Sequence, residues 1–126
     1  MQKEIRTSRA PKAIGPYSQG VLAGSLLFTS GQLPIDAQTG DMVGATVTEQ
    51  TKQSLENIKA VLEAGGASLE KVVKTTVFLR NMKDFADMNE VYSRYFKGSV
   101  LPSRSAVEVA RLPKDALVEI EAIAFI

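Results

Sequence analysis

The last 25 residues, Pro102–Ile126, read PSRSAVEVARLPKDALVEIEAIAFI and contain the two strand patterns that decide the fold. In the second pattern, alternate positions form a clean apolar face: Val118, Ile120, Ala122, Ala124 and Ile126. The positions between them form a mixed face: Leu117, Glu119, Glu121, Ile123 and Phe125. Because an ordinary solvated face is polar throughout, we expect another subunit to cover this one in part. Buried carboxylates are costly unless they are paired, so the mixed face is a candidate site.

The first pattern, residues 104–110, alternates in the same way. Side chains of successive strand residues point to opposite faces of a sheet. We expect Val107 and Val109, together with Ser105, to face the helices and join the core. Arg104 and Glu108, with Ala106, are then predicted to lie on the open face beside Glu119 and Glu121.

Working outward from these strands, the rest of the chain predicts two helices and further strands. Leu55, Ile58, Val61 and Leu62 recur at helical spacing in residues 46–64, and Gly65-Gly66 ends that helix. Asp84 is expected to cap a second helix that ends near Phe96, with one apolar stripe made of Phe85, Met88, Tyr92 and Tyr95 or Phe96.

Strands are predicted near residues 3–6, at 21–23 and 26–30 as a hairpin, and at 71–80. Residues 10–20 are predicted to be an ordered loop, and residues 112–115 a turn. The order β-β-β-α-β-α-β-β predicts one α+β domain, residues 1–126. Its two helices should pack on one face of a single mixed sheet.

Composition limits the function. The 15 basic and 14 acidic residues give a net charge of +1 without any block of like charge, which argues against nucleic acid and membrane partners. No apolar run reaches the roughly 20 residues of a membrane span. Because the N-terminus also lacks the apolar core of a signal peptide, we expect a cytoplasmic protein.

The chain has no cysteine and no histidine. It therefore lacks thiolate nucleophiles and thiolate metal ligands, and it lacks the commonest general base at neutral pH. Any catalysis must use carboxylates, hydroxyls, Arg or Lys side chains, backbone groups and bound water.

Four segments resemble the Rid (YjgF) family of reactive intermediate deaminases, and are closest to its RidA branch. They are AIGPYSQG at residues 13–20, TSGQLP at 29–34, KTTVFL at 74–79 and SRSAVEVARLPKDALVEIEAIA at 103–124. The resemblance implies a chorismate-mutase-like fold in a homotrimer, with ligand sites at the clefts between subunits. It also implies a hydrolase acting on C=N bonds without cofactor or metal, which converts 2-iminobutanoate, 2-iminopropanoate and 2-aminoacrylate to 2-oxo acids and ammonium.

The same resemblance assigns the site residues. Arg104 matches the arginine that binds the substrate carboxylate, and a planar guanidinium suits a carboxylate better than lysine does. Glu119 matches the acid that positions the hydrolytic water. Substrate-binding positions match Tyr17, Ser30, Gly31 and Asn89. For each residue a structural role is the alternative: an ion pair for Arg104 or Glu119, turn chemistry for the loop residues, and a local hydrogen bond for Asn89.

Ala106 departs from the family, because many RidA relatives have cysteine at this position. Imine hydrolysis needs no covalent step, since a protonated imine is already electrophilic. The role that the resemblance carries over belongs to the backbone near Arg104 and Ala106, which alanine preserves. The departure argues against a thiol mechanism more than against activity.

Two other functions stay open. One is a trimer that senses small 2-oxo or amino acids without turnover, which would keep Arg104 but would not need Glu119. The other is an RNA-directed activity, nuclease or translation inhibitor, against which the charge and the lack of histidine argue. A chorismate mutase activity would rest on fold analogy alone.

Overall fold

The computed structural model describes all 126 residues. Its strands are β1 (Gln2–Ile5), β2 (Gly20–Ala23), β3 (Leu26–Thr29), β4 (Val72–Leu79), β5 (Ser103–Glu108) and β6 (Val118–Phe125). Its helices are α1 (Val47–Ala64) and α2 (Phe85–Tyr95), and short 3₁₀ turns occupy Leu69–Lys71, Met82–Asp84 and Pro113–Asp115. The predicted element order is confirmed. Neither helix is long and apolar enough to cross a lipid bilayer.

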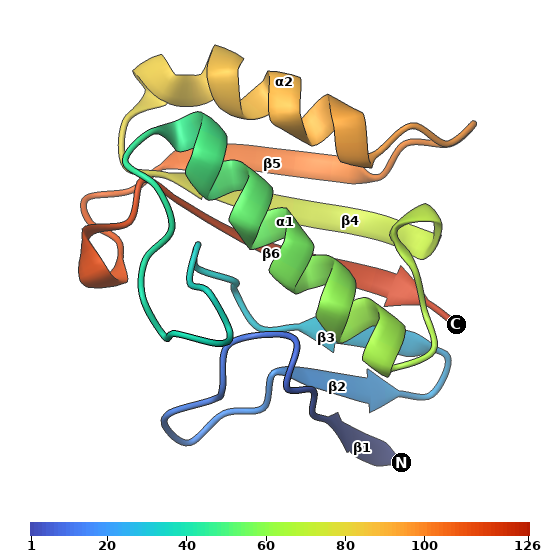
Figure 1. The fold of residues 1–126 in the computed structure, drawn as a ribbon. Helices are drawn as coiled ribbons and strands as arrows, with labels where there is room; N and C mark the ends of the chain where they lie inside the picture. The colour runs from blue at the N-terminus through green and yellow to red at the C-terminus, as the bar shows by residue number, and fades with distance from the viewer.

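The six strands form one sheet in the order β1-β2-β3-β6-β4-β5. Neighbouring strands are antiparallel except β4 and β5, which run parallel and are joined through α2. Figure 1 shows both helices on one face of the sheet, with β5 and α2 at one edge and β1 at the other. The predicted α+β class, mixed sheet and one-sided helix cover are confirmed.

Helix α1 begins at a capping box. Thr46 Oγ1 accepts the Glu49 N–H at 3.2 Å, and Glu49 Oε1 accepts the Thr46 N–H at 3.3 Å. This exchange satisfies two backbone donors that the first turn would otherwise leave unpaired. The predicted stripe is fully buried against the sheet, which confirms it: Leu55, Ile58, Val61 and Leu62.

Strand β6 carries the predicted two faces. The apolar face is buried beneath the helices: Val118, Ile120, Ala122 and Ala124. On the other face Glu119, Glu121 and Ile123 are partly exposed. The prediction is wrong for Ile126, which is 46% exposed, because the strand ends at Phe125 and no longer imposes alternation.

The predicted orientation of β5 is wrong. In the parallel ladder, Arg104 lies opposite Thr75 and Ala106 lies opposite Val77, and both β4 residues are buried on the helix face. Directly paired residues share a face, so Arg104, Ala106 and Glu108 belong to the helix side. Val107 instead faces the open side and is 41% exposed.

The predicted cap at Asp84 is also wrong, since its side chain makes no capping hydrogen bond. The chain enters α2 through the 3₁₀ turn, where Asn81 Oδ1 accepts the Lys83 N–H at 2.9 Å. Glu108 Oε1 accepts the Met82 N–H at 2.8 Å. Because the 3₁₀ turn precedes α2, the unpaired backbone N–H groups are those of Met82 and Lys83. The side chains of Glu108 and Asn81 accept hydrogen bonds from them. Glu108 thus has a structural role.

The sheet face without helices is rich in apolar side chains. Four large ones are about two-fifths exposed: Leu26, Phe28, Val107 and Phe125. Leu26 pairs with Phe125 across β3 and β6, and Val107 lies on the same face at the β5 edge, opposite Phe78. Exposed apolar side chains on one sheet face are typical of protein interaction sites.

Candidate active site

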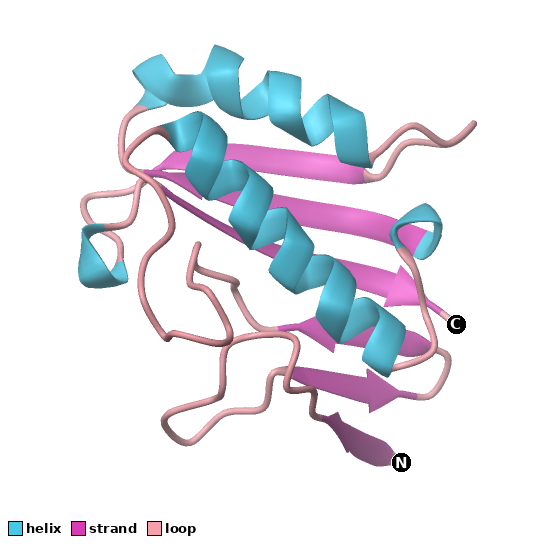
Figure 2. Cartoon of the chain, viewed as in Figure 1, coloured by secondary structure: helices cyan, strands magenta, loops and turns pink.

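Three loops gather on one side of the molecule, on the left in Figure 2. They cover residues 6–19, 30–46 and 109–117. Together with the start of β6 they line a pocket of about 420 Å³. Four predicted site residues line this pocket, which we call the Glu119 pocket: Tyr17, Ser30, Gly31 and Glu119.

The loop that carries Tyr17 is held in place by one buried amide, that of Gln19. Its Nε2 donates to the carbonyls of Thr7, Ala10 and Pro11, while its Oε1 accepts the Thr7 N–H at 2.7 Å. A buried amide with all these partners fixes the loop backbone. The predicted ordered loop is confirmed, and it leaves the Tyr17 side chain 51% exposed beside the pocket.

Ser30 joins the end of β3 to this loop. Its Oγ donates to the Ser18 carbonyl at 2.6 Å, and its N–H donates to the Gln19 carbonyl at 2.9 Å. The hydroxyl proton is therefore engaged, but the oxygen lone pairs can still accept a hydrogen bond from a ligand.

Gly31 lies directly beneath the Glu119 carboxylate. A Cβ at position 31 would be 2.7 Å from Glu119 Oε2 and 2.9 Å from its Cδ. The approach is fixed by the neighbouring residues, because Gln32 and Ile120 exchange backbone hydrogen bonds of 2.7 and 3.2 Å. Only glycine leaves the carboxylate in this position.

Glu119 is half-buried and belongs to none of the four ion pairs of the chain. Burial raises the pKa of its carboxyl group, and the Glu121 carboxylate raises it further. A carboxyl group whose pKa is raised in this way can take up and return a proton closer to neutral pH than an ordinary glutamate can.

The other predicted residues lie elsewhere, at the β5 edge. Arg104 Nη1 donates to Asn89 Oδ1 at 2.6 Å. The guanidinium carbon lies 5.4 Å from the ring centre of Phe85 and 4.7 Å from that of Tyr92. We call Arg104, Phe85, Asn89 and Tyr92 the Arg104 cluster. Ala106, two residues along β5, shares its face.

The two groups lie on opposite faces of the sheet. Arg104 pairs with Thr75 on the helix face, whereas Glu119 pairs with Phe78 on the open face. Two strand spacings and three residues along β4 separate their Cα atoms by about 14 Å. One small acid cannot contact both side chains within a single chain.

The Glu119 pocket is also lined by Lys12, Pro113 and Lys114, which the sequence motifs did not single out. Lys114 and Asp115 have φ values of 58° and 55°, in the left-handed region that few non-glycine residues adopt. Such backbone strain gathers at functional sites. The sequence predicted a turn at residues 112–115, but it gave no indication that this turn lines a pocket.

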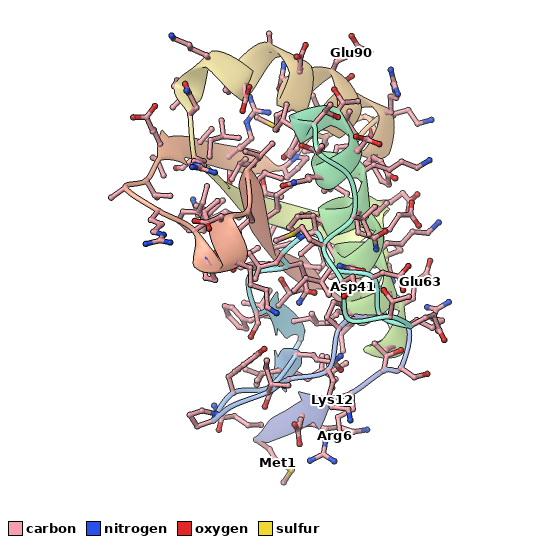
Figure 3. All side chains as sticks on the ribbon, turned by 60° about the vertical axis from the view of Figure 1, so that its left-hand side comes forward. Met1, Arg6, Lys12, Asp41, Glu63 and Glu90 are labelled. Carbon is pink, nitrogen blue, oxygen red and sulfur yellow. The ribbon has the colours of Figure 1, made fainter.

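A larger cavity of about 690 Å³ adjoins the pocket. Its lining includes Arg6 and Lys12, which Figure 3 labels near the N-terminus, and it shares Lys12, Tyr17 and Gln19 with the Glu119 pocket. Arg6 is paired with Glu4 at 3.0 Å. The chain contains no group of three acidic side chains arranged to hold a metal ion.

Comparison with known proteins agrees with this architecture. A family model described as endoribonuclease L-PSP matches residues 7–126. The crystal structure of a Rid family protein from Yersinia pestis has a TM-score of 0.97 and 48% identity over the whole of both chains. This chain belongs to the Rid family.

Other relatives match over nearly their full length. A RutC family protein of Pyrococcus horikoshii is 59% identical over 99% of this chain and 98% of its own. The 2-iminobutanoate/2-iminopropanoate deaminase of Salmonella typhimurium is 53% identical over 98% of both chains. The crystal structure of Escherichia coli TdcF with bound serine has a TM-score of 0.94 and 52% identity over 98% of both chains.

Proposed function

We propose that this protein is a cofactor-independent deaminase that hydrolyses 2-iminobutanoate, 2-iminopropanoate and the related enamine 2-aminoacrylate. The observation that carries the proposal is the Glu119 carboxylate, half-buried over Gly31 with a raised pKa and no cationic partner. The name of the Salmonella relative supports the substrate class. The serine bound to TdcF supports a site for small amino-acid-like carboxylates.

The complete site is proposed to form between subunits. Arg104 and Glu119 face away from each other in one chain, which supports a site to which two copies each contribute one of them. An interface that joins two different surfaces of the same chain is heterologous, and such interfaces form a ring when the rotation between copies closes. A homotrimer, which the family resemblance implies, is such a ring, and it would cover the apolar open face.

In the proposed reaction Arg104 binds the substrate carboxylate through two parallel hydrogen bonds. The backbone near Ala106 orients the imine. Glu119 of the facing subunit's pocket accepts a proton from water while the water oxygen bonds to the imine carbon, and the C=N π electrons move to nitrogen. The protonated Glu119 then gives its proton to the nitrogen. The C–N bond then breaks and its electron pair leaves with ammonia, while the new hydroxyl group gives its proton back to the Glu119 carboxylate and its oxygen forms the C=O bond of the 2-oxo acid. Glu119 passes this proton to the ammonia, so the products are the 2-oxo acid and ammonium.

This scheme assigns no role to a thiol. Ala106 supplies backbone groups only, and the electrophile is the protonated imine itself. Positioning and charge placement account for the acceleration.

The test is release of ammonia and 2-oxo acid from 2-aminoacrylate, generated in the assay by a serine or threonine dehydratase. We expect wild type to accelerate release and Arg104→Ala to lose the acceleration. If folded wild-type protein gives none, the enzyme proposal fails, and a sensor of small 2-oxo or amino acids becomes the leading function.

A further inference from the structure

One face of α2 is shaped around the Arg104 guanidinium. Phe85, Asn89 and Tyr92 follow one another at spacings of four and three residues, so they line a single face of the helix. The two rings lie 5.4 and 4.7 Å from the guanidinium carbon, within the range of cation–π attraction. The third contact is a hydrogen bond, which the amide oxygen of Asn89 accepts from Arg104 Nη1.

The Tyr92 ring is itself fixed. Its hydroxyl group shares a 2.7 Å hydrogen bond with Thr75 Oγ1, and both residues are buried, at 7% and 1% exposure. Thr75 is the β4 residue directly opposite Arg104. The hydrogen bond that attaches α2 to the sheet therefore lies beside the arginine, and burial raises the Tyr92 pKa, which keeps the phenol neutral.

These contacts hold Arg104 without neutralising it. Its hydrogen-bond partner is a neutral amide, and none of the four ion pairs of the chain includes it. Asn89 occupies Nη1 only, so Nε and Nη2 keep a pair of parallel donors with the spacing of a carboxylate.

We infer that Phe85, Asn89 and Tyr92 are positioning residues, which present the Nε–Nη2 edge of Arg104 to the substrate carboxylate. The inference rests on the proposed function, and it deepens that proposal by assigning the α2 face a role in carboxylate recognition. Asn89 then acts through Arg104 rather than by direct contact with substrate.

The first test replaces Phe85 by leucine, which keeps an apolar helix former but removes the π face. We expect Phe85→Leu to raise KM, and the inhibition constant of pyruvate, about threefold to tenfold, with kcat within about twofold. The matched control is Tyr95→Leu on the same helix, because the Tyr95 hydroxyl bonds Glu56 and does not reach Arg104. We expect this control to leave both constants unchanged.

The second test does not depend on turnover. In the wild type the two rings should shift the Arg104 Nε–H proton resonance upfield, and added pyruvate should move it downfield. Phe85→Leu should reduce the first shift and weaken the pyruvate response, and Tyr95→Leu should change neither.

The outcomes separate the two proposals. Wild type without imine hydrolysis would remove the proposed function, and the resonance would then decide the positioning role by itself. An active wild type with an unshifted Nε–H resonance, or with unchanged constants in Phe85→Leu, would overturn the positioning role alone.

Discussion

In the Glu119 pocket the reactive group is held by backbone. Gly31 leaves room for the carboxylate, Gln32 and Ile120 fix the approach of the two strands, and no side chain neutralises the charge. In the Arg104 cluster the charged group is instead held by side chains, two aromatic rings and one amide. Burial raises the pKa of Glu119, whereas side-chain contacts orient the Arg104 guanidinium.

The difference shows how one chain can supply the two unlike halves of the proposed site. Desolvation changes the proton affinity of a carboxylate, which a hydrolytic step uses. It cannot usefully change an arginine, which stays charged at any ordinary pH, so orientation is what the protein can improve. The two regions should therefore fail in different ways when they are altered.

The largest expected effect comes from mixing two inactive variants. Arg104→Ala and Glu119→Gln should each lower kcat/KM by about 100-fold or more. If neighbouring subunits supply the two groups, subunits of both variants, denatured and refolded together in equal amounts, should recover about a quarter of wild-type activity. Mixed oligomers with no recovery would contradict a shared site.

Glu119→Gln alone should affect turnover more than binding. We expect kcat to fall about 100-fold or more while the inhibition constant of pyruvate changes less than about threefold, since Arg104 is the residue proposed to bind the carboxylate. Glu121→Gln is the matched control on the same strand face, and it should keep most of kcat. Equal losses in the two variants would show that position 119 has no special role.

Gly31→Ala should displace the Glu119 carboxylate without unfolding the chain. A misplacement of about 1 Å costs up to roughly 100-fold in rate, so we expect kcat to fall between about tenfold and 100-fold. Thermal melting should change little, because the carboxylate is a movable group. The control is Gly98→Ala, where a new Cβ would meet only a backbone oxygen at 3.7 Å. An unchanged kcat in Gly31→Ala would show that catalysis does not need glycine beneath the Glu119 carboxylate.

The smallest effects should appear in pH dependence. Burial and Glu121 raise the pKa of Glu119 in the folded chain above its unfolded value. The native state then binds more protons between those two pKa values, so the free energy of unfolding falls as pH rises through that range. Glu119→Gln cannot ionise and should lack that part of the fall, which melting curves across this range would measure.

The acid limb of the pH profile of kcat tests the same raised pKa of Glu119. The limb should lie above the pH expected for an ordinary glutamate, because the unprotonated Glu119 is the base in the proposed reaction and its pKa is raised. Glu121→Gln removes one of the two causes of the raised pKa, so it should shift the limb to lower pH. A limb that stays in place would exclude Glu121 from the tuning of Glu119.

The sequence by itself determined most of the elements and much of the core. Helical spacing identified the buried stripe of α1, and strict alternation identified the buried face of β6, because these patterns extend over long segments. The motifs also pointed to Tyr17, Ser30, Gly31 and Glu119, which the structure brings to one pocket.

Only the tertiary structure decided which way β5 faces. Alternation along an edge strand does not say which set of side chains faces the core. Because Val107 and Val109 are apolar, the sequence predicted that their set faces the helices, which is wrong for Val107. The parallel pairing with β4 turned Arg104 toward α2 instead, opposite the buried Thr75. Local sequence specifies alternation, but register with a neighbouring strand specifies the face, and that contact joins residues about 30 positions apart in the chain. The register of β5 with β4 therefore places Arg104 and Glu119 on opposite faces of the sheet.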